Sequence, residues 1–117
     1  RVRTINNKAF LTIKGISIGA TRKEFEYEIP FDEGKTMLNE LCEKPLIEKY
    51  RYKIEAGNNL IWEIDEFLGE NKGLIVAEIE LEFEAQQFKK PDWLGEEVTG
   101  NSKFYNSSLV KFPFSMW

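Results

Sequence analysis

Hydrophobic and polar residues alternate with period two along most of the chain, the pattern of β-strands with two distinct faces. The alternation predicts strands at residues 1–5, 9–14, 21–29, 46–55, 60–68 and 73–85, the last being the longest. The turn signals at 6–8 and 57–59 predict that the flanking strands form hairpins. A short irregular or edge piece is expected at 16–20.

Helical spacing interrupts this pattern in a few places. Asp32 is suited to cap a helix, and Met37, Leu38 and Leu41 share one face, which predicts a helix over about 33–42. A short helical turn is expected at 91–95 and a looser helical pattern at 101–111. The sequence therefore indicates an α+β chain that is mostly β, and its 117 residues suit one domain.

The charged faces of the predicted strands are sorted by sign. Basic faces carry Arg1 and Arg3, and Lys49, Arg51 and Lys53; acidic faces carry Glu24, Glu26 and Glu28, Glu63 and Asp65, and the row Glu78, Glu80, Glu82 and Glu84. One explanation is an ordinary sheet with a solvated face and cross-strand ion pairs. The other is a barrel with a charged interior, its apolar face covered by helices or a partner subunit. Because rows of like charge are costly without counterions, a metal bound to a polyphosphate would satisfy both kinds of row.

Composition narrows the chemistry. The chain has no histidine, which excludes Ser-His-Asp and Cys-His catalysis and any zinc site that uses histidine. A metal would need oxygen ligands, which suit magnesium, calcium or manganese. Cys42 is the only cysteine and cannot form an internal disulfide, so a cytoplasmic location is expected. A net charge of −4 argues against nucleic acid as partner, and no apolar stretch is long enough to predict a membrane span.

Several short motifs follow one another in a specific order. They are Arg-Val-Arg at 1–3, Leu-Thr-Ile-Lys-Gly at 11–15, the runs at 22–30, 47–52, 62–67 and 74–81, and Pro-Asp-Trp-Leu-Gly-Glu-Glu-Val-Thr at 91–99. In this order and spacing the sequence resembles the CYTH domain, also called the triphosphate tunnel metalloenzyme family, in its compact bacterial form. The resemblance implies an eight-stranded antiparallel tunnel-like barrel with a few covering helices. It also implies hydrolysis of a triphosphate compound with Mg²⁺ or Mn²⁺.

The resemblance further implies roles for individual residues. The phosphate-binding positions are Arg1, Arg3, Lys14, Lys49 and Arg51, with Lys103 beside the tunnel mouth. The metal-binding pair is Glu78 and Glu80, with further acidic lining positions at Glu24, Glu26 and Asp65. Catalysis is expected to depend on Glu78, Glu80, Arg51 and Lys49.

Family members open with a strand carrying Glu-x-Glu-x-Lys, which should precede Arg1, so residues 1–117 are expected to form one domain that lacks its first strand. Inorganic tripolyphosphate is the favoured substrate. Thiamine triphosphate hydrolysis, cyclic AMP formation and a non-catalytic polyphosphate- or nucleotide-binding module stay open, as does a homodimer. A barrel for an apolar ligand is another alternative, and it requires Phe25, Tyr27 and Ile79 to line the cavity.

Overall fold

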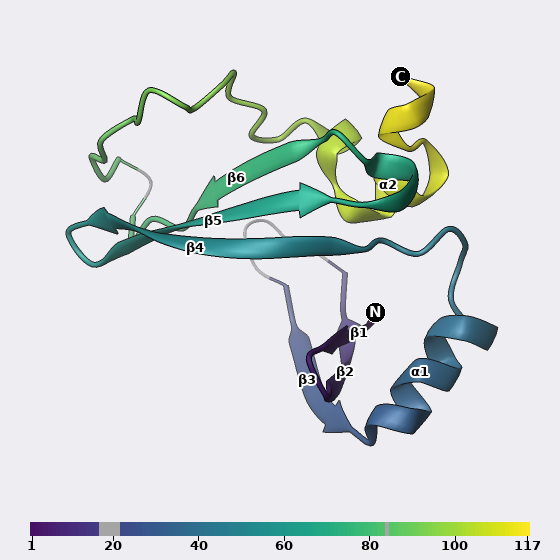
Figure 1. Ribbon diagram of the computed structural model, residues 1–117. Helices are drawn as coiled ribbons and strands as arrows, with labels where there is room; N and C mark the ends of the chain where they lie inside the picture. Colours follow the sequence, from purple (N-terminus) through teal and green to yellow (C-terminus); the bar gives the residue numbers. More distant parts are fainter. Residues whose placement is uncertain (17–21, 84) are drawn as a thin grey trace. The chain divides into compact units, whose positions relative to one another are not determined.

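A computed structural model of the protein describes residues 1–16, 22–83 and 85–117. The chain divides into two compact units, unit 1 (Arg1–Leu46) and unit 2 (Ile47–Trp117), each built on a three-stranded sheet (Figure 1). Most of the piece expected at 16–20, together with Thr21 and Glu84, lies outside the described residues. The mostly β prediction is confirmed, and the strands described belong to two three-stranded sheets.

The sheet of unit 1 has the order β1 (Val2–Ile5), β2 (Lys8–Lys14) and β3 (Glu24–Ile29), all antiparallel. The predicted first hairpin is confirmed, and Asn6 adopts the positive φ of 55° that a tight turn needs. β3 begins at Glu24, whereas the sequence predicted a start at residue 21.

Helix α1 (Phe31–Glu40) follows β3 and packs on β1 and β2 (Figure 1). It begins two residues earlier than predicted, because Pro30 is the N-cap residue; Asp32 lies in the first turn with Glu33, where both favour the helix dipole. A Cβ at Gly34 would lie 2.4 Å from the Cβ of Ala9, so the missing side chain permits this close approach. The helix thus covers the Ala9 face of β2 and leaves the opposite face to the charged residues.

The sheet of unit 2 has the order β4 (Lys49–Gly57), β5 (Leu60–Phe67) and β6 (Ile75–Ile79), again antiparallel. Gly57, Asn58 and Asn59 form the predicted hairpin turn with φ of 80°, 52° and 62°. Glycine and asparagine tolerate this left-handed region best, so the turn chemistry explains why the hairpin was predictable.

The predicted long strand at 73–85 is wrong in its extent, since β6 ends at Ile79. Ile79 pairs with Trp62, close to the start of β5, so the neighbouring strand offers few further partners. Beyond this point the backbone turns: the Glu82 amide donates to Gln86 Oε1 at 2.6 Å, and the Gln86 amide donates to the Phe83 carbonyl at 3.0 Å. Alternation continues past Ile79 in the sequence, but a strand lasts only as long as its hydrogen-bonding partner.

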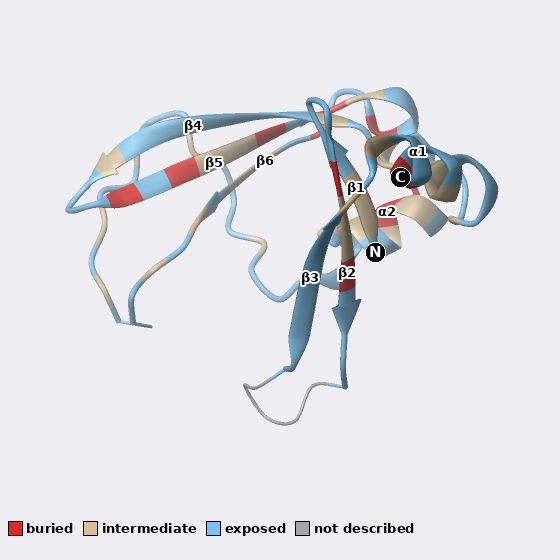
Figure 2. Cartoon of the chain, turned by 90° about the horizontal axis from the view of Figure 1, so that it is seen from below, coloured by how far each residue is buried: buried red, intermediate tan, exposed pale blue. Residues whose placement is uncertain are grey.

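The core of unit 2 lies where its C-terminal helices meet the sheet. Phe67, Leu74 and Leu109 are buried there, with Ile47, Val76, Phe104 and Phe114 packed around them. The pattern at 101–111 forms two short pieces, η2 (Ser102–Phe104) and α2 (Asn106–Lys111), and η3 (Phe114–Met116) follows. After β5, η1 (Gly69–Asn71) buries Asn71, whose Oδ1 accepts from the Phe114 amide at 2.8 Å. Figure 2 shows buried positions spaced along β5, as expected for a central strand.

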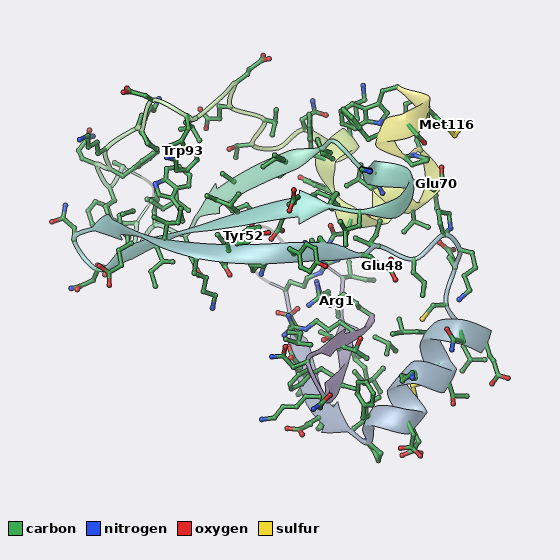
Figure 3. The ribbon with its side chains drawn as sticks, in the orientation of Figure 1. Arg1, Glu48, Tyr52, Glu70, Trp93 and Met116 are labelled. Carbon is green, nitrogen blue, oxygen red and sulfur yellow. The ribbon has the colours of Figure 1, made fainter. Side chains whose placement is uncertain are left out.

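The segment after β6 returns to the opposite face of this sheet. Trp62 makes edge contacts with Phe88 and Trp93, with ring centroids 5.8 Å and 5.5 Å apart. Figure 3 labels Trp93 on this segment. The predicted turn at 91–95 is present, with the Leu94 amide donating to the Pro91 carbonyl. No helix in the described residues is long and apolar enough to cross a membrane.

Candidate functional site

One face of the unit 2 sheet collects most of the charge. Side chains two apart on a strand share a face, and the register places Arg51 opposite Asp65 and Lys53 opposite Glu63. Glu63 in turn lies opposite Glu78 on β6. The basic residues of β4 therefore lie beside the acidic residues of β5, where they can form ion pairs across the two strands.

Asp65 is the centre of this face. It is 2% exposed, and its Oδ1 accepts from Arg51 Nε at 2.7 Å. Its Oδ2 accepts from Lys49 Nζ at 2.7 Å and from Arg51 Nη2 at 2.9 Å. Burial by itself favours the neutral acid, but the hydrogen bonds from Arg51 and Lys49 together outweigh it, so the pKa of Asp65 is held below its ordinary value. The carboxylate is therefore charged at neutral pH and binds two cations at once.

Arg51 keeps part of its donor capacity for another group. Its Nε and Nη2 bind Asp65, and its Nη1 donates to Glu63 at 3.2 Å. The hydrogen bond to Asp65 is the main reason that the pKa of Arg51 is raised. A guanidinium has five N–H donors, so two of them are left after these three bonds, and the side chain is 37% exposed. This is a donor arrangement that suits a phosphate group.

Glu63 and Glu78 are opposite one another in the strand register, and like charges in such positions repel. Glu80 follows directly after the end of β6. Among the described residues no three acidic, cysteine or histidine groups form a ready-made metal cage. Two carboxylates suffice for magnesium or manganese when phosphate and water supply the remaining ligands, so the donor set fits such an ion. Glu63 was not among the predicted site residues. The sequence showed that Glu63 and Asp65 share one strand face, but it did not show that Glu63 lies opposite Glu78.

The charged face of unit 1 carries the other predicted residues. Arg3 donates to Glu26 at 3.0 Å, Lys14 lies 3.4 Å from Glu24, and Arg1 pairs through its backbone with Thr12. Within the described part of the chain, Arg3 Nε and Thr12 Oγ1 are buried without a hydrogen-bond partner. Buried polar atoms are usually satisfied, so an oxygen-rich ligand at this face would supply what they lack.

The predicted site residues thus form two groups. Unit 1 holds Arg1, Arg3, Lys14, Glu24 and Glu26, and unit 2 holds Lys49, Arg51, Asp65, Glu78, Glu80 and Lys103. Lys103 differs from the rest, since its Nζ lies 4.0 Å from the centre of the Trp117 ring and 6.0 Å from that of Phe112. These contacts hold Lys103 against Phe112 and Trp117, the residues that directly follow α2 and η3.

The apolar faces bear on the alternative of an apolar ligand. Phe25 and Tyr27 are each 54% exposed, on the face of unit 1 opposite the ion pairs. That is also the face on which α1 packs over Ala9, so the chain's own helix supplies part of its cover. Ala9 is buried beneath α1 whereas Phe25 and Tyr27 are half exposed, so this apolar face is partly covered in the structure.

The fold and these faces define a mostly β protein with paired basic and acidic strand faces suited to a polyanion and a divalent ion. The sequence profile of the CYTH domain matches residues 1–113, and the chain belongs to this family.

Two relatives are named inorganic triphosphatase. The protein from Acetivibrio thermocellus is 57% identical over 114 residues, covering 97% of this chain and 72% of the relative. The protein from Nitrosomonas europaea is 33% identical over 112 residues, covering 94% of this chain and 73% of the relative. The crystal structure of the inorganic triphosphatase NE1496 superposes with a TM-score of 0.69 at 27% identity, covering 93% of this chain and 69% of that one.

Proposed function

We propose that this protein is an inorganic triphosphatase that hydrolyses a phosphoanhydride bond of tripolyphosphate with the help of a divalent metal ion. The observation that carries the proposal is the unit 2 face, where Asp65 holds Lys49 and Arg51 one row from the opposed Glu63 and Glu78. Cationic donors and a pair of opposed glutamates on one face suit a metal–polyphosphate complex. The family and the named relatives support the same activity.

The architecture that we propose is a single domain in which the sheets contribute strands to an eight-stranded tunnel. The charged faces of both sheets would then point inward and the apolar faces outward, toward helices such as α1. The two orphaned atoms on the Arg3 face support this orientation, because an interior ligand would satisfy them.

In the proposed mechanism the basic residues bind and orient the substrate. Arg51 offers its two remaining N–H donors to a phosphate, and Lys49 adds a second charge beside it. The other proposed phosphate-binding residues are Arg1, Arg3, Lys14 and Lys103. Preorganised positive groups stabilise the charge that develops on the transferring phosphoryl group.

The acidic residues would hold the metal, Mg²⁺ or Mn²⁺. Glu78 and Glu80 are the proposed pair, with Glu24 and Glu26 as further acidic lining. Glu63 is added to these proposed metal-binding residues because it lies opposite Glu78. A divalent ion at such a site neutralises phosphate charge and helps to activate water.

The proposal is tested with purified protein and a panel of tripolyphosphate, ATP and thiamine triphosphate, each with Mg²⁺ and with Mn²⁺. We expect metal-dependent phosphate release, fastest from tripolyphosphate. Cyclic AMP formed from ATP would favour a cyclase instead, and binding of tripolyphosphate without phosphate release would favour a non-catalytic binding module. Arg51→Ala and Glu80→Ala are expected to fold and to lose activity; retained activity in either would remove that residue from the mechanism.

The cellular setting stays a prediction. We propose a cytoplasmic protein whose partner is a small triphosphate, as the lone Cys42 and the charged faces suggest. Size-exclusion chromatography with light scattering would decide between monomer and homodimer.

A further inference from the structure

Asp65 stands apart from the other acidic residues of the candidate site in how it is bonded. It is buried in the middle strand of the unit 2 sheet, and both of its oxygens already accept hydrogen bonds from cations. A carboxylate offers about four lone-pair positions, and three are taken here. Glu63, by comparison, accepts one bond from Arg51 and is 34% exposed.

From this geometry we propose that Asp65 is a positioning residue for the Lys49–Arg51 pair and does not ligate the metal. The proposal deepens the proposed function and rests on it, since it names how the phosphate-binding cations of that site are held. It replaces the metal-binding role that the family resemblance implied for Asp65.

The spacing of the two cations depends on one atom. Asp65 Oδ2 lies 2.7 Å from Lys49 Nζ and 2.9 Å from Arg51 Nη2, so a single oxygen bridges the ammonium and the guanidinium. Oδ1 then fixes the rotation of the guanidinium through Nε, at 2.7 Å. Without this bridge, two like charges two residues apart on one strand face would repel and separate.

A metal ion at Asp65 would meet the same two cations. A divalent ion bound to either oxygen would lie within a few ångströms of Lys49 and Arg51, inside a largely buried site where screening is weak. The row formed by Glu63 and Glu78 carries more negative charge: Glu63 is 34% exposed and accepts one bond from Arg51 Nη1, at 3.2 Å, and Glu78 adds a second carboxylate opposite it. The sheet therefore separates the two tasks by one row: Asp65 arranges the anion-binding cations, and the glutamate row attracts the metal.

The experiment compares Asp65→Asn with Glu78→Gln in the full chain, two variants that each remove one negative charge from this face. Calorimetry measures tripolyphosphate binding in the presence of a chelator, and electron paramagnetic resonance measures Mn²⁺ binding without substrate. For Asp65→Asn we expect tripolyphosphate affinity to fall about tenfold or more, since misplaced charged hydrogen bonds weaken binding by that order. Its Mn²⁺ affinity should be unchanged. Glu78→Gln should show the reverse pattern.

Kinetics add a second readout. Asp65→Asn should raise KM for tripolyphosphate by a larger factor than it raises the metal concentration that gives the half-maximal rate. Asp65→Glu, which keeps the charge, should recover part of the tripolyphosphate affinity, and it also serves if Asp65→Asn does not fold. Loss of Mn²⁺ binding with unchanged tripolyphosphate binding in either Asp65 variant would overturn the proposal.

The two proposals fail separately. Phosphate release by the unmodified protein tests the triphosphatase activity. The ratio of tripolyphosphate affinities between the unmodified protein and Asp65→Asn tests the positioning role. A protein that binds tripolyphosphate without hydrolysing it, and loses that binding in Asp65→Asn, would refute the activity and support the role of Asp65.

Discussion

Glu63 on β5 lies directly opposite Glu78 on β6, so two carboxylates face each other across neighbouring strands. Opposed like charges destabilise a sheet by about 0.2–1 kcal/mol. On the other side Glu63 is opposite Lys53 and accepts from Arg51, whereas the like charge of Glu78 across from it is repulsive. Such a pairing is useful if a divalent cation binds there, and it can be tested directly.

Glu78→Gln should therefore stabilise the metal-free protein slightly and remove its stabilisation by metal. The gain is expected to be about 0.2–1 kcal/mol in the free energy of unfolding, because one of the opposed charges is gone. Thermal unfolding with a chelator and with Mn²⁺ measures both effects. Glu66→Gln is the matched control, since Glu66 lies on the other face of β5 and should leave the Mn²⁺ effect intact. An unchanged Mn²⁺ shift in Glu78→Gln would contradict a metal site at this pair.

Arg51 offers a test of geometry against charge. Arg51→Lys keeps the positive charge but cannot bind Asp65 through a fork, so we expect the protein to fold and its triphosphatase rate to fall at least about tenfold. Arg51→Ala removes two of the three donors to a buried carboxylate and should cost about 1–3 kcal/mol of stability. Urea unfolding compares it with Lys53→Ala, a basic neighbour on the same strand face. Equal stability losses in Arg51→Ala and Lys53→Ala would argue against the Asp65 contact.

The depressed pKa of Asp65 predicts how stability depends on pH. A carboxylate whose pKa is lower in the folded than in the unfolded protein stabilises the fold above the unfolded value, about 4, and loses that contribution as pH falls through the folded value. The difference in unfolding free energy between the unmodified protein and Asp65→Asn should thus be constant from about pH 5 to 7 and shrink below about pH 4. Denaturant unfolding across this range measures it. A difference that grew as the pH fell would show that the sign is wrong.

Gly34 tests the packing of α1 on the sheet of unit 1. Gly34→Ala would place a Cβ 2.4 Å from that of Ala9, so the helix must shift, and we expect a loss of about 1–3 kcal/mol. Adding Ala9→Gly should restore much of the loss because it makes room for the new methyl group. Gly95→Ala is the control, since nothing lies within 4 Å of the added atom. Thermal unfolding of the unmodified protein, the three single variants Gly34→Ala, Ala9→Gly and Gly95→Ala, and the double variant measures the effect. Additive losses in the double variant would contradict the contact.

Local signals in the sequence were sufficient for the hairpins. The turn at 57–59 contains glycine and asparagine at positions with positive φ, so its chemistry alone predicts where the chain reverses. The helix was predicted because its apolar spacing is local as well, though its start moved to Pro30. The end of β6 was not predictable in this way, since it depends on where β5 stops offering partners.

The candidate site shows the same division. The sequence indicated that Lys49, Arg51, Asp65, Glu78 and Glu80 lie on charged strand faces, and the structure places the β4, β5 and β6 members on one face of one sheet. The sequence did not indicate that Asp65 binds both Lys49 and Arg51, or that Glu63 faces Glu78. Those relationships depend on register, and a shift of one residue in pairing would replace every one of them.

The sequence by itself determined which side chains share a face, where the chain turns and, through its motifs, the family to which it belongs. Each of these depends on residues close together in the chain. Only the tertiary structure decided which charge meets which, because cross-strand hydrogen bonding sets the register. It also decided which carboxylate is buried between two cations and which one is opposed to its own kind. That difference separates Asp65 from Glu63, although the two occupy neighbouring positions on the same face of β5.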